Sequence, residues 1–140
     1  MLNQSLTLNS STGSLQAARD FVSDYARTAG FGEDDVYKLE LAVDEACTNI
    51  IKHAYKNDLS KFMDIHLSSD NNKFIISIED SGVEFRESEY HEPVLAESLK
   101  QRKRGGLGIH LIKSFMDEVE FKRKDNKNIL KMTKFINNNG

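Results

Sequence analysis

The sequence predicts a single α+β domain in which helices cover one face of a mixed, mostly antiparallel sheet. The length of 140 residues suits one hydrophobic core. Strand-like and helix-like segments follow one another in the order strand, helix, helix, strand, strand, helix, strand, strand. The chain is 39% hydrophobic and 29% charged, as in folded rather than disordered proteins. We therefore expect one two-layer α/β sandwich over residues 1–140.

The N-terminal half is expected to form one strand and two helices. Residues 5–8 alternate polar and apolar side chains, as a half-buried strand does. Residues 15–29 repeat apolar positions at three- and four-residue steps, and Gly30 follows at a favoured helix end. A second helix should run from about Glu33, where acidic residues suit the helix dipole, to about Tyr55. Its apolar stripe comprises Val36, Leu39, Val43, Ala46, Cys47, Ile50 and Ala54.

The C-terminal half is expected to hold two hairpins separated by one helix. The helix should cover residues 109–116, where apolar positions again recur at helical steps. The expected strands are 62–67, 73–79, 118–122 and 129–136. Residues 84–104 are polar or mixed and longer than a usual connection, which suggests a lid over a site.

Charge and cysteine content exclude several classes of function. The 19 basic and 22 acidic residues give a net charge of -3, so no overall positive field favours nucleic acid or anionic membranes. Cys47 is the only cysteine, which excludes an internal disulfide and a site of several thiolates. The sequence shows neither a membrane span nor a signal peptide. We expect a cytoplasmic protein with no nucleic-acid or membrane partner.

A first group of candidate site residues lies on the second helix. Glu45, Asn49 and Lys52 are spaced i, i+4, i+7, so they share one edge, with His53 beside them. A carboxylate can act as a general base, an amide oxygen can bind a hard divalent cation, and a lysine can meet phosphate. Taken alone, the triplet is more typical of a solvated helix face.

A second candidate is the segment Asp80-Ser81-Gly82 at the end of an expected strand. An aspartate there can accept a hydrogen bond from an exocyclic amine, and a glycine lets a ligand approach the backbone. The same three residues also form ordinary turns. By itself the segment indicates a turn more strongly than a site.

A third candidate is the glycine-rich start of the helix that follows residue 104. Three glycines in residues 105–108 would leave backbone donors free for an anion. The basic run 100–104 just before them could complement a triphosphate. The segment lacks the Gly-Lys-Ser/Thr of a Walker A loop and does not follow a strand as a Rossmann fingerprint does. A flexible hinge is an equal alternative.

In order and spacing, these segments resemble the Bergerat-fold ATPases of the GHKL superfamily, and most closely the anti-sigma-factor serine/threonine kinases of RsbW type. Residues 40–55 resemble the N box of that family. Residues 78–82 resemble its first glycine box, and residues 104–112 its second. The resemblance extends from about Ser5 to Phe135.

The resemblance implies a site for ATP and Mg²⁺. Asn49 would hold the magnesium ion, Asp80 would recognise the adenine amino group, and Glu45 would act as the catalytic base. Histidine kinases of the superfamily usually have asparagine at the position of Glu45, whereas the serine kinases have glutamate. The implied nucleotide-binding set is Asn49, Lys52, His53, Asp80, Gly82, Arg104, Gly105, Gly106, Leu107, Gly108, Ile109 and Thr133.

The resemblance further implies an ATP-dependent protein serine/threonine kinase that regulates a partner-switching pathway. Such kinases phosphorylate a serine or threonine of a STAS-domain antagonist and bind a sigma factor, and family members often dimerise. One alternative is a binding module that switches partners with ATP occupancy but does not transfer phosphate. A histidine-kinase-like catalytic module is disfavoured by Glu45.

Overall fold

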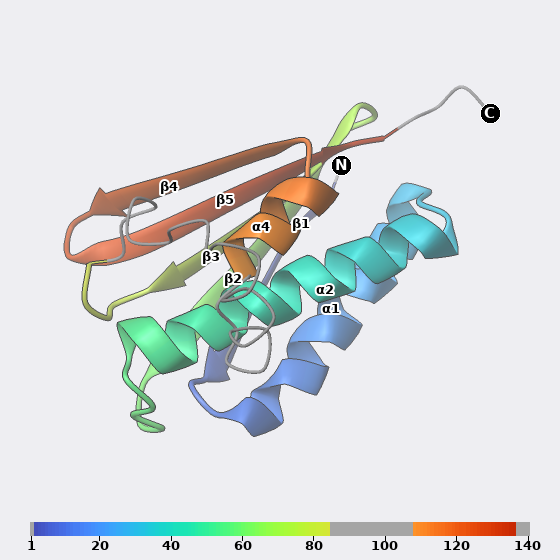
Figure 1. Ribbon diagram of the computed structural model, residues 1–140. Helices are drawn as coiled ribbons and strands as arrows, with labels where there is room; N and C mark the ends of the chain where they lie inside the picture. Colours follow the sequence, from blue (N-terminus) through green and yellow to red (C-terminus); the bar gives the residue numbers. More distant parts are fainter. Residues whose placement is uncertain (1, 85–107, 137–140) are drawn as a thin grey trace, which may run out of the picture.

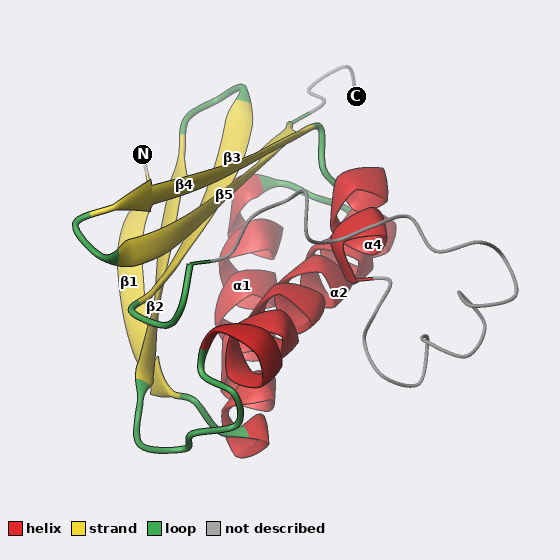
Figure 2. Ribbon diagram, turned by 60° about the vertical axis from the view of Figure 1, so that its left-hand side comes forward, coloured by secondary structure: helices red, strands yellow, loops and turns green. Residues whose placement is uncertain are grey.

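The computed structural model describes residues 2–84 and 108–136, which form two layers, a sheet and a layer of helices (Figures 1 and 2). The strands are β1 (Leu2–Asn9), β2 (Phe62–Ser69), β3 (Lys73–Asp80), β4 (Glu118–Lys124) and β5 (Lys127–Phe135). The helices are α1 (Leu15–Ala29), α2 (Glu33–Asn49) and α4 (Gly108–Phe115), with a 3₁₀ turn η1 (Thr12–Ser14) and a π-helical turn η2 (Ile50–Ala54). The α+β sandwich expected from the sequence is confirmed.

The five strands are ordered β1-β2-β3-β5-β4. The sheet predicted from the sequence was mixed and mostly antiparallel, and in the structure every neighbouring pair among these strands is antiparallel. Two of these pairs, β2–β3 and β4–β5, are hairpins, and antiparallel pairing of this kind needs no crossover helix. In the register of β3 with β5, Asp80 lies opposite Asn128. The end of β3 and the start of β5 therefore meet at one end of the sheet.

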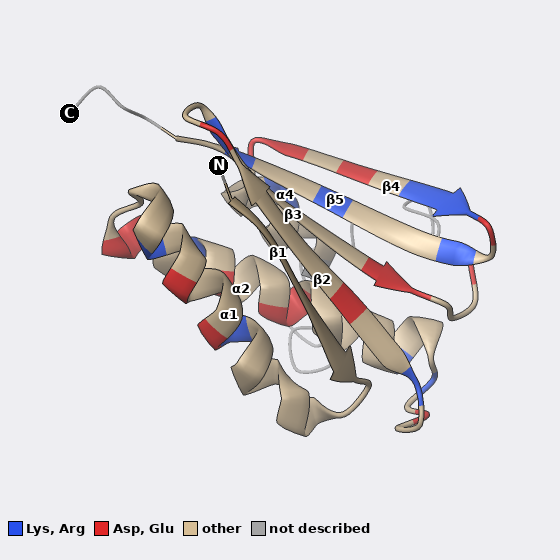
Figure 3. Ribbon diagram, turned by 180° about the vertical axis from the view of Figure 1, so that it is seen from behind, with Lys and Arg blue, Asp and Glu red and all other residues tan. Residues whose placement is uncertain are grey.

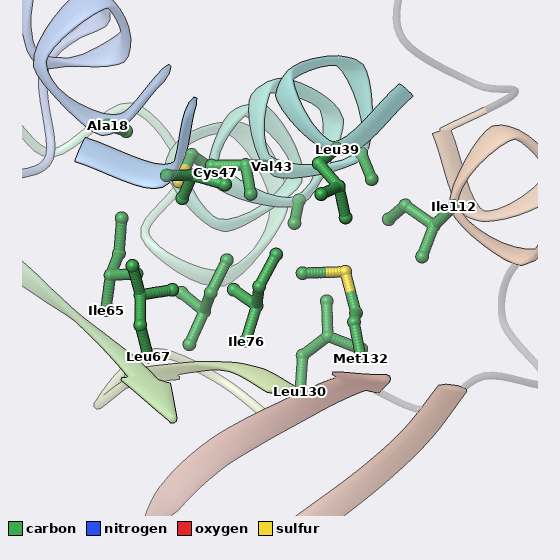
Figure 4. Close-up of a cluster of buried hydrophobic side chains, with 14 of the residues drawn as sticks. Ala18, Leu39, Val43, Cys47, Ile65, Leu67, Ile76, Ile112, Leu130 and Met132 are labelled. Atoms are coloured by element: carbon green, nitrogen blue, oxygen red, sulfur yellow. The ribbon is translucent and has the colours of Figure 1, made fainter. Parts of the chain in front are cut away.

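The core lies between the sheet and the helices. Side chains alternate along the central strands, and the inward set packs against the apolar stripe of α2, as Figure 4 shows. Members of the core with no exposed surface include Leu39, Val43, Cys47, Ile65, Leu67, Ile76 and Met132. All seven residues of the stripe predicted on the second helix are buried, which confirms that prediction.

The second helix differs from its prediction in the last turn. Its α-helical part ends at Asn49, and residues 50–54 form a wider π turn. The Tyr55 N–H donates to the Ile50 carbonyl at 2.9 Å, five residues back. Hydrophobic periodicity does not distinguish this turn from an α-helical one, because Ile51 and Ala54 are buried in either case. Single π turns are frequent at functional sites.

Helix α4 lies beside α2 in the helix layer (Figure 1). Lys134 of β5 fixes it there, because its Nζ donates to the Phe115 carbonyl at 3.2 Å and lies 3.7 Å from an Asp35 carboxylate oxygen of α2. Ile112 of α4 is buried in the hydrophobic core. Within the described part of the chain, no helix is long and apolar enough to cross a bilayer.

Candidate nucleotide site

A pocket opens where the ends of β3 and α2 meet the β4–β5 hairpin. It encloses about 440 Å³ of empty space, its open mouth included. It is lined by Ala46, Asn49, Ile50, Ala54, Asp80, Ile112, Phe121, Lys122, Asn128, Ile129 and Leu130. Most of these side chains are apolar, so the pocket suits a flat, largely apolar ring with a few polar edges.

Asp80 is the buried carboxylate of this pocket and is only 5% exposed. Its Oδ1 accepts hydrogen bonds from Asn128 Nδ2 at 2.8 Å and from the Gly82 N–H at 2.9 Å. Burial raises the pKa of Asp80, while the two hydrogen bonds and the charge of Arg123 oppose that rise. Within residues 2–84 and 108–136, no hydrogen bond reaches Asp80 Oδ2, which leaves an acceptor for a ligand amine.

The edge of α2 places two buried oxygen atoms one helical turn apart. Asn49 is 7% exposed and lines the pocket. Asn49 Oδ1 and Glu45 Oε2 are buried, and neither has a hydrogen-bond partner among the described residues. A buried polar atom without a partner costs about 1 to 3 kcal/mol, so each needs an explanation such as a ligand. The interpretation of this edge as a solvated face is therefore wrong at Asn49.

Glu45 has an altered acidity. Burial raises the pKa of its carboxyl, the negative charge of Asp44 raises it further, and Lys52 lowers it. A carboxylate whose pKa is raised is a better proton acceptor, which suits a general base.

The remaining predicted site residues fall into three groups. Lys52 and His53 lie on the π turn with exposed side chains and do not line the pocket. Gly108 begins α4, and Ile109 is buried in the first turn of that helix. Residues 104–107 (Arg104, Gly105, Gly106 and Leu107) lie outside the described residues, as does the predicted lid apart from Glu84.

The structure explains why residue 82 is a glycine in a different way from the sequence, which suggested close approach of a ligand to the backbone. A Cβ at Gly82 would lie 2.4 Å from the Ala54 carbonyl oxygen, closer than real contacts allow. The next residue binds the same group, because the Val83 N–H donates to Ala54 O at 3.0 Å. The close approach at Gly82 is thus made by the chain itself, and it joins the end of β3 to the π turn.

Thr133 does not line the pocket. It pairs with Ile75 of β3, toward the other end of β5 from Asn128. The family resemblance placed Thr133 in the nucleotide-binding set, but the sequence did not determine the register of its strand. In the structure, Asn128 is the β5 residue beside Asp80.

Sequence reasoning missed three residues that shape this site. Asn128 falls between the predicted strands 118–122 and 129–136, but it is buried and contacts Asp80. Arg123 Nη1 donates to Asn128 Oδ1 at 3.1 Å and to the Gly82 carbonyl at 2.9 Å. The Tyr55 hydroxyl donates to the Phe62 carbonyl at 2.6 Å and accepts from the Ser81 N–H at 2.7 Å. Asn128 lies next to Asp80 only because of how β3 and β5 pair, so only knowledge of the strand register could have revealed it.

The donors fit a magnesium ion held mainly by phosphate and water. No group of three or more His, Cys, Asp or Glu side chains in the described ranges could hold a metal. Mg²⁺ keeps several waters and commonly takes only one or two protein oxygens when substrate phosphates are present. The unpaired Oδ1 of Asn49 is an oxygen of that kind.

Comparison with known proteins agrees with this fold and pocket. Residues 8–134 match the family described as the histidine kinase-like ATPase domain. The RsbU and RsbW domains of a Mycobacterium tuberculosis protein superpose with a TM-score of 0.68 at 13% identity, over 96% of this chain and 33% of that one. The Pseudomonas aeruginosa SiaB–SiaC complex gives a TM-score of 0.55 at 12% identity, over 94% of this chain and 89% of that one.

Curated relatives define the type more narrowly. Serine-protein kinase RsbW of Halalkalibacterium halodurans is 35% identical over 119 residues, which is 82% of this chain and 72% of the relative. The Bacillus cereus enzyme of the same name is 32% identical over 115 residues, or 79% of this chain and 71% of the relative. The chain belongs to the histidine kinase-like ATPases and, within them, to the serine-protein kinases of the RsbW family. Membership implies that it binds ATP.

Proposed function

We propose that this protein transfers the γ-phosphoryl group of ATP to a serine or threonine of a STAS-domain partner, with Glu45 as general base and Asn49 as the protein ligand of Mg²⁺. The observation that supports this most is the pair of buried, unpartnered oxygens, Glu45 Oε2 and Asn49 Oδ1, at one edge of α2. A metal–phosphate group and a substrate hydroxyl would satisfy both.

In the proposed reaction, the hydroxyl oxygen of the partner attacks the γ-phosphorus of ATP. The bond from that phosphorus to the β,γ-bridging oxygen breaks, ADP leaves, and Glu45 accepts the hydroxyl proton. Asn49 would help to orient the phosphates through the metal, whose charge stabilises the phosphate oxygens when it is bound. Glu45 lies one turn before Asn49, so both side chains reach the same side of the helix.

The adenine ring would occupy the apolar pocket beside Asp80. Ile50, Ile112 and Leu130 supply apolar wall there, and Asp80 supplies the acceptor for the exocyclic amine. Leaving that amine unpaired in a buried site would cost about 1 to 3 kcal/mol. The apolar wall and the acceptor together support adenine as the ring bound here.

The proposed protein partners are suggested by the family to which the chain belongs. The neighbour from Pseudomonas aeruginosa was solved as a SiaB–SiaC complex, and the Mycobacterium tuberculosis neighbour carries RsbU and RsbW domains in one chain. These names support a regulator that acts through protein partners. We propose a STAS-domain antagonist as the phosphoacceptor, with a sigma factor as the alternative partner and a homodimer as the assembly.

Phosphoryl transfer to a partner tests this function. With labelled ATP, Mg²⁺ and candidate STAS-domain proteins, the parent should label a serine or threonine. Glu45→Gln should keep ATP affinity but transfer roughly 10²- to 10⁴-fold more slowly, the usual contribution of a general base. Glu40→Gln, on the same helix, is the control and should transfer at the parental rate. Parental transfer by Glu45→Gln would refute the role of Glu45, and no transfer by the parent would favour a non-catalytic ATP-switched module.

A further inference from the structure

A connected group of polar side chains lies behind Asp80 on the β4–β5 hairpin. Asn128 Nδ2 donates to Asp80 Oδ1 at 2.8 Å and to the Val83 carbonyl at 2.7 Å. Arg123 Nη1 donates to Asn128 Oδ1 and to the Gly82 carbonyl. Asn128 is 6% exposed, so these hydrogen bonds are shielded from bulk water. We call Asn128 and Arg123 the hairpin clamp.

We propose that the hairpin clamp positions Asp80 for adenine and selects adenine over guanine nucleotides. This inference rests on the proposed nucleotide site. Asn128 fixes one carboxylate oxygen and the backbone at Val83, and Arg123 fixes Asn128 and the backbone at Gly82. Asp80 Oδ2 is then held as the free acceptor, so less rotational freedom is lost when the nucleotide binds.

The clamp also favours the ionised form of the Asp80 carboxyl group. Among residues 2–84 and 108–136, the charged and titratable groups near Asp80 are Arg123 and Lys122 of β4 and Tyr55, which follows η2. Burial disfavours the carboxylate, whereas the Asn128 hydrogen bond and the Arg123 charge favour it. Figure 3 shows basic residues gathered at the end of β4 and the start of β5, beside this edge of the sheet.

An ionised acceptor discriminates between the purines. The adenine amine donates to a carboxylate, whereas guanine presents a carbonyl oxygen at the equivalent ring position, which a carboxylate repels. If the clamp is removed, Asp80 can rotate or take up a proton, and a protonated carboxyl can donate to that carbonyl. Loss of the clamp should therefore weaken ADP binding and affect GDP binding little.

Calorimetric titration of the full chain with ADP and with GDP, from pH 5 to 8, tests the proposal. Asn128→Ala should raise the Kd for ADP about tenfold at pH 7.5, the value of one hydrogen bond to a charged group. Arg123→Gln should raise it about threefold. Lys124→Gln removes the same charge from the adjacent, exposed position and should leave the Kd unchanged. The ratio of the Kd for GDP to that for ADP should fall in the first two variants.

The pH profile separates positioning from a merely structural effect. ADP affinity should fall as the pH drops through the pKa of Asp80. In Asn128→Ala this fall should begin at higher pH, because a donor to the carboxylate is lost. The proposal would be overturned if a folded Asn128→Ala variant kept both the pH profile of ADP affinity and the ratio of the Kd for GDP to that for ADP. If that variant does not fold, Asn128→Ser gives the same comparison. A parent that binds no ADP would instead contradict the proposed function.

Discussion

Glu45 shows how single side chains at this site reduce the stability of the folded protein. Burial raises the pKa of Glu45 above its unfolded value. A raised pKa contributes stability below the unfolded pKa, and this contribution is lost as the pH rises through the folded pKa. At neutral pH the buried carboxylate is therefore unfavourable to folding. The proposed role of Glu45 as general base would account for a carboxylate at this position.

We predict that Glu45→Gln gains stability relative to the parent at high pH. The melting temperature without nucleotide should be higher for the variant at pH 8, and the difference should vanish near pH 4. Glu33→Gln is the matched control at the start of the same helix, because Arg27 lowers the pKa of Glu33. That variant should show no gain at pH 8. A Glu45→Gln variant that is less stable than the parent at pH 8 would contradict the conclusion that the buried carboxylate of Glu45 destabilises the folded protein.

Asn49 carries the corresponding prediction for the metal. Because its buried Oδ1 has no partner among the described residues, Asn49→Ala removes an oxygen that Mg²⁺ would use. The parent should bind ADP more tightly with Mg²⁺ than with a chelator, and Asn49→Ala should lose most of that difference. Lys38→Ala, exposed on the same helix, should respond as the parent does. Identical magnesium responses of Asn49→Ala and the parent would remove the metal role.

At the scale of elements, the order and type of the segments were predictable from the sequence. Within residues 2–84 and 108–136, apolar periods of two and of three to four residues identify the five strands and three α-helices, because burial on one face imposes those periods. The π turn after Asn49 and the contact between Asp80 and Asn128 were not predictable in this way. Both depend on how elements meet, and a local period contains no information about strand register.

The junction of β3 with the π turn gives a prediction at this scale. Gly82→Ala would place a Cβ 2.4 Å from the Ala54 carbonyl oxygen, so the backbone must shift. We expect a loss of about 1 to 3 kcal/mol of unfolding free energy and weaker ADP binding, because Asp80 moves with the junction. Gly13→Ala is the control, since its Cβ would meet only Ser11 Oγ at 3.7 Å. Denaturant unfolding measures the stability of the two variants. Equal stability of Gly82→Ala and the parent would contradict the close packing at Gly82.

Across the whole molecule, the two layers supply different parts of the proposed site. The helix layer contributes Glu45 and Asn49, and the sheet layer contributes Asp80 and Asn128. A nucleotide that contacts both layers would bind the folded chain and not the unfolded one. Binding should therefore stabilise the whole domain by mass action, about 2.7 kcal/mol at a ligand concentration of 100 times Kd.

Cys47 provides a probe for this coupling. It is the only cysteine, it is fully buried between the layers (Figure 4), and burial raises the pKa of its thiol to about 12. A thiol reagent reacts with the thiolate, so labelling should require the core to open.

We predict that Cys47 labelling in the native protein is slow and that ADP at 100 times Kd slows it about 100-fold further, in proportion to the population of the open form. Leu39→Ala, which leaves a cavity in the same core, should speed labelling without altering the proposed contacts to the nucleotide. The measurement is the rate of thiol modification, with a denatured sample as the reference for a fully exposed cysteine. Labelling that proceeds at the denatured rate, or that does not respond to ADP in a protein shown to bind it, would contradict the coupling of the two layers through the nucleotide.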